Sequence, residues 1–408
     1  MTARTFVVVG ASLSGATAVT SLRDRGFDGR LILVGDEPDP PYERPGLSKR
    51  YLRGEQLREE LTVRPPGWWQ DHDVDVVLGT TVDAIDLDRR SIVLAGGGAV
   101  PFDAALVATG VRNRRLEVPG ADLEGIFQLR RVADADALRE RASAGGHAVV
   151  VGMGFVGAEV AASLRTLGLD VTVVEVFETA LYRVLGGELG RVVESIHRDH
   201  GIEVITGETV ERFEGSGSVG GVRIRSGRTI ACDLVVVGVG TEPNAEVMGD
   251  LGRGAGGAVE VDRSLRTSLP GVFAAGDVAV HDHPVFGPVR VEHYDNALRM
   301  GEHVAGAMLG STEPFDDPHW FWSDQFDSEI QMGGVRLTDD MVVRGSIRDR
   351  TFCAFFLDPA GVLRATVSLD WPRDCRRSLP LIRRQVVPDR AALADPAVDL
   401  RTLDPARA

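Results

Sequence analysis

Cysteine is scarce in this sequence. The 408 residues include only three cysteines, Cys232, Cys353 and Cys375. They lie far apart, so none belongs to a C-x-x-C pair or has the spacing of metal ligands. We therefore expect no redox-active dithiol and no metal site. Any electrons that the protein handles must reside on a bound cofactor.

Long apolar runs are also absent. The longest stretches, such as residues 6–10 and 234–240, have the length of a strand and fall far short of a membrane span. The first strand is expected almost at the initiating methionine, which leaves no room for a secretory signal. A net charge of −15 argues against nucleic acid or an anionic membrane as the main partner. We expect a cytoplasmic protein.

Lysine is almost missing. Lys49 is the only lysine among 45 basic residues. A bias this strong indicates that arginine has replaced lysine wherever a planar cation serves equally well. The position that keeps lysine therefore indicates a need for a compact ammonium with three donors. A surface lysine kept by chance is the alternative.

Glycine, by contrast, is abundant, with 48 residues. Many glycines lie next to short runs of valine and isoleucine, which indicates tight strand-to-helix turns rather than flexible linkers. A chain of 408 residues is too long for one core and suggests two or three domains.

An internal repeat organises the chain. Each copy predicts a strand, a glycine-rich turn, a helix and a second strand that ends in an acid, the order of a Rossmann mononucleotide-binding half. The first copy covers residues 6–37, with its turn at Gly10, Ser12, Ser14 and Gly15 and its acids at Asp36 and Glu37. The second covers residues 148–175, with its turn at Gly152, Gly154, Phe155, Val156 and Gly157 and its acid at Glu175.

These turns are suited to pyrophosphate. One glycine makes the tight turn, the next lets the backbone approach the phosphates, and the helix N-terminus offers free N–H groups. Ser12 replaces the usual second glycine of the first copy and is still small. Glu175 would repel a 2′-phosphate, so the second copy favours NADH over NADPH, and Arg183 is the only nearby feature against this. We expect one site for FAD and one for NADH.

Three more segments fit this plan. The strand before Ala108, Thr109 and Gly110 ends where the chain is expected to pass out of the first domain. The strand and turn at residues 233–240, with Gly238 and Gly240, are expected where the chain passes back into it. A later strand ends in Gly276 and Asp277, which places a carboxylate at the strand edge where open α/β sheets bind ligands.

With these motifs, the chain resembles the FAD-dependent pyridine nucleotide–disulfide oxidoreductases. Within them it is similar to the NADH-dependent ferredoxin reductases of bacterial P450 and Rieske dioxygenase systems, over essentially its whole length. The segment 41–49, PYERPGLSK, marks this branch, because Lys49 stands near the point where disulfide reductases carry their cysteine pair.

The resemblance implies an α/β fold with two Rossmann-like domains and a C-terminal α+β domain with an antiparallel sheet. The expected boundaries are 1–108 with 240–315 for FAD, 109–239 for NADH and 316–408 for the C-terminal domain. A helix over residues 297–309 and strands near 342–347 and 351–357 are expected in the last third of the chain.

The resemblance also implies site residues. Lys49 would lie at the flavin edge, and Glu159 would face the nicotinamide and pair with Lys49 or with the carboxamide. A carboxylate stabilised only by the helix dipole is the alternative reading of Glu159. The FAD residues would be Gly10, Ser12, Ser14, Gly15, Asp36, Glu37, Arg44, Lys49, Val82, Ala108, Thr109, Gly110, Arg130, Gly276, Asp277, Glu292, Tyr294 and Trp322. The NADH residues would be Gly152, Gly154, Phe155, Val156, Gly157, Glu159, Glu175, Gly238 and Gly240.

The implied activity is hydride transfer from NADH to FAD, followed by single-electron transfer to a [2Fe-2S] ferredoxin. Docking residues for that ferredoxin would be Arg290, Trp320, Trp322, Arg376 and Arg377. Two alternatives stay open: a reductase of a small organic acceptor such as monodehydroascorbate or a quinone, and a redox-sensing flavoprotein like apoptosis-inducing factor. A monomer or a homodimer is expected.

Overall fold

The computed structural model describes residues 4–249 and 252–407. The chain forms two compact units, each built from three stretches of sequence. The first unit comprises the chain up to Glu43, then Arg58–Arg112 and Thr241–His319; the second comprises Arg44–Leu57, Asn113–Gly240 and the chain from Trp320 onward.

A five-stranded parallel sheet forms the centre of the first unit. Its strands have the order β19 (Val272–Ala274), β7 (Ala104–Val107), β1 (Thr5–Val9), β2 (Arg30–Val34) and β3 (Val74–Val77). The three central strands are almost wholly apolar and buried, as expected for a parallel sheet covered on both faces.

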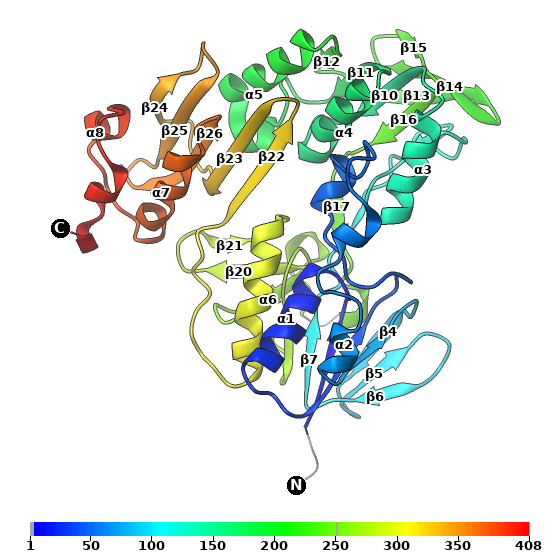
Figure 1. Ribbon diagram of the computed structural model, residues 1–408, viewed down its shortest axis with the longest axis vertical. Coiled ribbons are helices and arrows are strands. Elements are labelled where there is room, and N and C mark those ends of the chain that lie inside the picture. The colour runs from blue at the N-terminus through cyan, green and yellow to red at the C-terminus, as the bar shows by residue number, and fades with distance from the viewer. Residues whose placement is uncertain (1–3, 250–251, 408) are drawn as a thin grey trace. The chain divides into compact units, whose positions relative to one another are not determined.

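Two helices of this unit lie side by side, α1 (Leu13–Asp24) and α6 (Tyr294–Met308) (Figure 1). Gly301 on α6 allows this close approach, because a Cβ atom there would lie 2.6 Å from the Ser14 carbonyl oxygen. Smaller sheets and a short helix complete the unit: β4 (Val82–Asp86), β5 (Ser91–Leu94), β6 (Ala99–Pro101), β18 (Val259–Val261), β20 (Ala279–His283), β21 (Gly287–Val289) and α2 (Trp68–Asp71).

The second unit contains another five-stranded parallel sheet. Its order is β12 (Glu203–Thr206), β11 (Asp170–Glu175), β10 (His147–Val151), β16 (Leu234–Val237) and β9 (Ile126–Phe127). Its helices are α3 (Val132–Ala142), α4 (Phe155–Thr166) and α5 (Tyr182–Asp199), and a three-stranded sheet is formed by β13 (Val210–Ser216), β14 (Ser218–Ile224) and β15 (Thr229–Ala231).

An antiparallel sheet follows in the same unit. Its order is β22 (Trp320–Gln325), β23 (Ser328–Gly334), β26 (Leu363–Leu369), β25 (Thr351–Leu357) and β24 (Met341–Ser346), joined by α7 (Pro372–Arg383) and α8 (Arg390–Ala394). Strand β22 packs against α4, so the antiparallel sheet and the parallel sheet of this unit share a boundary.

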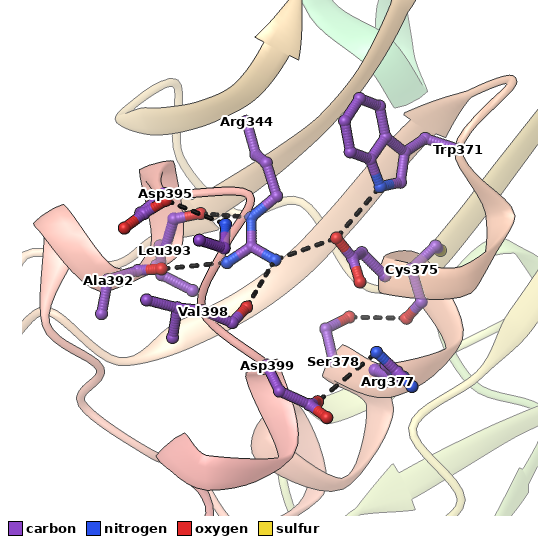
Figure 2. A network of polar contacts seen from close by, with 12 residues as sticks. Arg344, Trp371, Cys375, Arg377, Ser378, Ala392, Leu393, Asp395, Val398 and Asp399 are labelled. Carbon is purple, nitrogen blue, oxygen red and sulfur yellow. Dashed lines mark hydrogen bonds and ion pairs between the residues drawn. The ribbon is translucent and has the colours of Figure 1, made fainter.

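A buried arginine holds the C-terminal segment to this sheet. Arg344 on β24 is 1% exposed and donates hydrogen bonds to the carbonyl oxygens of Ala392, Leu393 and Val398 (Figure 2). It also donates to Asp374 on α7 over 2.9 Å. The guanidinium therefore holds α8 and the residues after it against the sheet. It does so by donating to carbonyl groups that would otherwise be buried without hydrogen-bond partners.

The predicted fold class is confirmed: two parallel Rossmann-like sheets and a C-terminal antiparallel sheet are present. The predicted helix at 297–309 begins three residues earlier, at Tyr294, because the extended backbone of His293 caps it. Throughout the described residues, no helix is both long and apolar enough to cross a membrane. The three domain boundaries expected from the sequence stay a prediction.

Candidate functional site

The first glycine-rich turn lies between β1 and α1 of the first unit. Gly10 has φ +116°, and a Cβ atom there would lie 2.1 Å from the Ala108 carbonyl oxygen. A Cβ atom on Gly15 would lie 2.0 Å from the Gly10 carbonyl oxygen. Both positions therefore require glycine, as predicted for a dinucleotide turn.

The helix N-terminus next to this turn carries a polar group without a partner. Ser14 is buried, and its hydroxyl oxygen has no hydrogen-bond partner among the described residues. Gly276 lies directly against it, since a Cβ atom there would be 3.1 Å from the Ser14 Cβ. An unsatisfied hydroxyl at a helix N-terminus is suited to a phosphate oxygen, so these residues fit the pyrophosphate of FAD.

The segments that leave and re-enter the first unit lie together. Thr109 donates a hydrogen bond from its hydroxyl to the Asn244 carbonyl oxygen over 2.6 Å, and the Asn244 backbone N–H donates to the carbonyl oxygen of Gly110. The segment that leaves the first unit and the segment that re-enters it are thus in direct contact.

Other predicted FAD residues of this unit take part in local contacts. After β2, Asp36 is exposed and Glu37 accepts a hydrogen bond from Tyr42; Val82 begins β4. Tyr294 donates to Glu43 over 2.7 Å, and burial raises the pKa of the Tyr294 phenol.

Arg290, predicted to contact the ferredoxin, lies in the same unit. It pairs with Glu292 over 2.6 Å and donates a hydrogen bond to the carbonyl oxygen of Asp277. Arg290 is therefore held to two of the predicted FAD residues, which ties its position to theirs.

The second glycine-rich turn lies between β10 and α4 of the second unit. Gly152 has φ +95°, and a Cβ atom there would lie 2.4 Å from the Gly238 carbonyl oxygen; a Cβ on Gly157 would lie 2.1 Å from the Gly152 oxygen. Gly154 differs, since no atom of the described residues outside its own turn lies within 4 Å of its Cβ position. The open space next to Gly154, at the start of a 12-residue helix, fits a second pyrophosphate.

Around this turn, Phe155 packs edge-on against Phe321 and Val156 is 46% exposed. Gly240 follows β16 with φ +101° and has no neighbour at its Cβ position.

Glu175 ends β11, as predicted, but its carboxylate is turned to the backbone. One oxygen accepts from the Met153 N–H and the other from the Phe177 N–H over 2.9 Å. The side chain is 5% exposed. Glu175 therefore holds the glycine-rich turn in place.

Lys49 and Glu159 form a buried ion pair. Lys49 Nζ lies 3.0 Å from Glu159 Oε1, and the two side chains are 11% and 7% exposed. Glu159 and Ser163 lie one turn apart on α4, and the Ser163 hydroxyl donates to the carbonyl oxygen of Ser48. This face of α4 thus holds the loop that presents the lysine.

Three further side chains complete the surroundings of the pair. Ser48 donates its hydroxyl to Glu159 Oε2 over 2.5 Å, and Ser323 on β22 donates to Oε1 over 2.6 Å. The Trp322 ring centroid lies 5.6 Å from Lys49 Nζ, within range of a cation–π contact. Residues from a loop, a helix and the C-terminal sheet therefore meet at one charge pair.

The neighbouring arginine residues are also fixed. Arg44 donates to the Arg130 carbonyl oxygen over 2.6 Å, and the Arg130 N–H donates to Asp134. The structure thus brings two predicted FAD residues of the second unit, Arg44 and Arg130, into direct contact.

The predicted docking residues of the C-terminal part form a smaller group. Trp320 and Trp322 stack with centroids 5.4 Å apart, and the Arg376 guanidinium lies 5.0 Å from the Trp320 ring. Arg376 is exposed, whereas Arg377 pairs with Asp399 over 3.4 Å. An exposed cation on an aromatic pair is suited to an acidic protein surface.

The three cysteines are free and buried. Burial raises the pKa of Cys232 and of Cys375 to about 12, and it raises the pKa of Cys353 as well. Thiols held neutral in this way are poor nucleophiles.

Four residues at or behind the ion pair have no sequence motif of their own: Ser48, Ser323, Gln325 and His197. Ser48 precedes Lys49, and Ser323 and Gln325 follow Trp322, so their proximity to predicted residues was the only available signal. His197 lies on α5, 38 positions beyond Glu159, and nothing in its local sequence points to the site.

Comparisons with known proteins agree with this geometry. The family described as pyridine nucleotide-disulphide oxidoreductase matches residues 4–301, and the reductase C-terminal family matches residues 320–404. Rhodocoxin reductase of Rhodococcus erythropolis is 37% identical over 95% of this chain and 92% of its own length. The ferredoxin–NAD(+) reductase component of the biphenyl dioxygenase system of Paraburkholderia xenovorans is 35% identical over 98% of both chains.

Solved structures give the same result. The ferredoxin reductase for the CYP199A2 system from Rhodopseudomonas palustris has a TM-score of 0.94 and 35% identity, covering 98% of this chain and 100% of its own. Putidaredoxin reductase, in its covalent complex with putidaredoxin, has a TM-score of 0.94 and 31% identity, covering 99% and 98%. The chain therefore belongs to the FAD-dependent pyridine nucleotide–disulphide oxidoreductases, and within them to the bacterial ferredoxin reductases.

Proposed function

We propose that the protein is an NADH-dependent ferredoxin reductase that supplies a P450 or a ring-hydroxylating dioxygenase through a [2Fe-2S] ferredoxin. The observation that carries the proposal is the buried Lys49–Glu159 pair, which stands in a chain whose only thiols are buried and neutral. Relatives named as ferredoxin–NAD(+) reductases align over nearly the full length. Bound FAD supplies the chemistry that this task needs, because it accepts a hydride and releases its electrons singly.

In this proposal the residues of the chain bind, orient and stabilise. The turn at Gly10, Ser14 and Gly15 holds the FAD pyrophosphate, and the turn at Gly152, Gly154 and Gly157 holds that of NADH. Lys49 would offer a fixed ammonium to the negative charge of reduced FAD, and Glu159 would orient that ammonium and the nicotinamide. No general base is required.

We further propose that the acidic ferredoxin docks at the Trp320–Trp322 pair, with Arg376 and Arg377 facing it. The net charge of −15 would repel an acidic partner elsewhere on the surface, so a local basic site has to steer the encounter. The protein would work in the cytoplasm, where NADH is regenerated, as a monomer or a homodimer.

Rapid mixing tests the central proposal. FAD-loaded protein is mixed with NADH or NADPH while flavin absorbance is followed, and the reduced protein is then mixed with candidate [2Fe-2S] ferredoxins. We expect faster reduction by NADH and rapid reoxidation by a ferredoxin. Normal reduction of the flavin by NADH without electron transfer to any such ferredoxin would contradict the proposal. Fast turnover with a quinone would instead favour the alternative of a small organic acceptor.

Charge reversal tests the docking site. Replacing Arg376 and Arg377 by glutamate should weaken ferredoxin reduction by about tenfold at low salt and flatten its salt dependence. The matched control places glutamate at Arg89 and Arg225, two exposed arginines remote in sequence. Equal effects of the two double variants would show that only net charge matters.

A further inference from the structure

A line of polar side chains runs from the interior of the second unit to Glu159. His197 on α5 is fully buried, and its Nε2 lies 2.9 Å from the Gln325 side-chain oxygen. The Gln325 amide nitrogen lies 3.1 Å from the Ser323 hydroxyl oxygen, which in turn lies 2.6 Å from Glu159 Oε1. Ser323 and Gln325 are also buried, at 0% and 1% exposure.

The direction of these hydrogen bonds follows from the charge at one end. A carboxylate can only accept, so the Ser323 hydroxyl has to donate to Glu159. Its oxygen then accepts from the Gln325 amide N–H, which leaves the Gln325 carbonyl to accept from His197 Nε2–H. With the amide reversed, the serine hydroxyl would be drawn toward the Gln325 oxygen, and its lone pairs would face the carboxylate.

The histidine end is consistent with this direction. Desolvation by burial lowers the pKa of His197 to about 4, so the imidazole is neutral near pH 7 and carries one ring proton. Nδ1 has no hydrogen-bond partner among the described residues, whereas Nε2 has Gln325. The neutral tautomer that carries its proton on Nε2 is therefore favoured, because only Nε2 has an acceptor to which it can donate.

Ser48 differs from Ser323 in this respect. Its hydroxyl also donates to Glu159, but a second acceptor, the carbonyl oxygen of Pro45, lies 3.5 Å away. Within residues 4–249 and 252–407, no donor to the Ser48 hydroxyl oxygen is seen. The Ser48 hydroxyl can therefore rotate, whereas that of Ser323 is held by the residues behind it.

We propose that His197, Gln325 and Ser323 are positioning residues that form a one-directional hydrogen-bond relay, which keeps the Glu159 carboxylate aimed at Lys49. Because buried donors fix the carboxylate before substrate arrives, no reorganisation is needed when NADH binds. This inference rests on the proposed function for its kinetic consequence, while the relay itself is a property of the folded chain.

The first experiment tests the relay without any reaction. FAD-loaded protein with ¹⁵N-labelled histidine is studied by NMR at pH 7.5, and the His197 signals are assigned from their loss in His197→Gln. We expect a neutral ring protonated at Nε2, with its signal displaced in Gln325→Met and unchanged in Ser378→Ala. A proton on Nδ1, or no response to Gln325→Met, would overturn the relay even if NADH reduces the flavin normally.

The second experiment tests the consequence. In Ser323→Ala, the limiting rate of flavin reduction by NADH should fall by about three- to tenfold, because Glu159 loses one buried donor and keeps its contacts to Lys49 and Ser48. In Gln325→Met, which removes no contact to Glu159, the limiting rate should fall by about two- to fivefold. The NADH concentration for half-saturation should change by less than about twofold in both, because the pyrophosphate turn is untouched.

Ser378→Ala is the matched control. Ser378 on α7 is a fully buried serine of the same unit. Its hydroxyl donates to the Cys375 carbonyl oxygen and lies 2.8 Å from the Thr366 hydroxyl oxygen, and it makes no contact with the site. Limiting rates in Ser323→Ala and Gln325→Met that fall no further than in Ser378→Ala would refute the positioning role. Absence of NADH-dependent flavin reduction in the unmodified protein would instead refute the proposed function, with the NMR result still deciding the relay.

Discussion

At the scale of single residues, the Lys49–Glu159 pair shows why charge type matters. A compact ammonium can point one N–H at Glu159 while its remaining donors stay free for another acceptor. An arginine would instead present a planar fork of five donors, with a different geometry toward the carboxylate. The only lysine of the chain thus occupies a buried ion pair.

Lys49→Met tests the role proposed for this ammonium. We expect the limiting rate of flavin reduction by NADH to fall by roughly 100- to 1,000-fold, the loss typical of one preorganised electrostatic donor. The flavin midpoint potential should become more negative by roughly 30 mV or more, because the reduced flavin loses a stabilising positive charge. For a two-electron couple, 30 mV corresponds to about 1.4 kcal/mol. Arg50→Met, which removes a neighbouring exposed charge, is the control. If the rate and the potential were unchanged, Lys49 would have no electrostatic effect on the flavin, and its role would be structural.

Gly154→Ala tests the second pyrophosphate site. The added methyl group would enter open space, so the melting temperature should stay within about 2 °C, while the dissociation constant for NADH should rise more than about tenfold through a clash with the phosphates. Flavin content should not change. Gly220→Ala on β14, whose Cβ position also has no close neighbour, is the control. Unaltered NADH binding would place the pyrophosphate elsewhere.

At the scale of elements, one side chain can decide whether a segment is ordered. Arg344 joins β24 to α8 and to Val398, which follows that helix (Figure 2). It also joins β24 to α7, because Asp374 accepts from both Arg344 and the Trp371 indole N–H. The C-terminal segment has few strands or long helices of its own. Its attachment therefore depends on this buried guanidinium more than on local propensity.

Arg344→Met should destabilise the protein by about 3–5 kcal/mol, because it leaves the buried Asp374 carboxylate without its cation. Chemical denaturation followed by tryptophan fluorescence measures this change, and limited proteolysis should cut first near α8. Arg390→Met, which breaks an exposed ion pair with Asp340, should leave the denaturation midpoint almost unchanged. Equal midpoints for the two variants would contradict the anchoring role.

At the scale of the whole molecule, buried histidines couple stability to pH. Desolvation by burial lowers the pKa of both His197 and His281 to about 4, and it also lowers the pKa values of His283, His303 and His319. The unfolded chain binds protons at these groups below about pH 6.5, whereas the folded chain does not. Stability is therefore complete above pH 6.5 and is lost as the pH falls toward 4.

We expect the free energy of unfolding to decrease between pH 6.5 and 4.5 by several kcal/mol, since a fully expressed shift of this size is worth on the order of 3 kcal/mol per histidine. Asp295 offsets part of the loss, because burial raises the pKa of its carboxyl to about 6 and the folded state binds that proton first. Urea titrations at several pH values measure the slope. Constant stability over this range would contradict the prediction.

The sequence by itself determined the two parallel sheets, their glycine-rich turns and the choice of dinucleotides as ligands. These features are local: a strand, a turn that only glycine permits and a helix N-terminus follow one another within about 15 residues. It also singled out Lys49 by composition and, through the family resemblance, Glu159. Helix starts such as Tyr294 were placed less well, because a cap can be supplied by any residue with an extended backbone.

Only the tertiary structure decided what surrounds the ion pair. His197 on α5, Ser323 and Gln325 on β22 and Glu159 on α4 are separated by up to 166 positions, and no periodicity or spacing links them. Their hydrogen bonds exist because β22 packs against α4 and brings polar side chains into a buried space where each needs a partner. Long-range packing, rather than local sequence, therefore sets the electrostatics of the site.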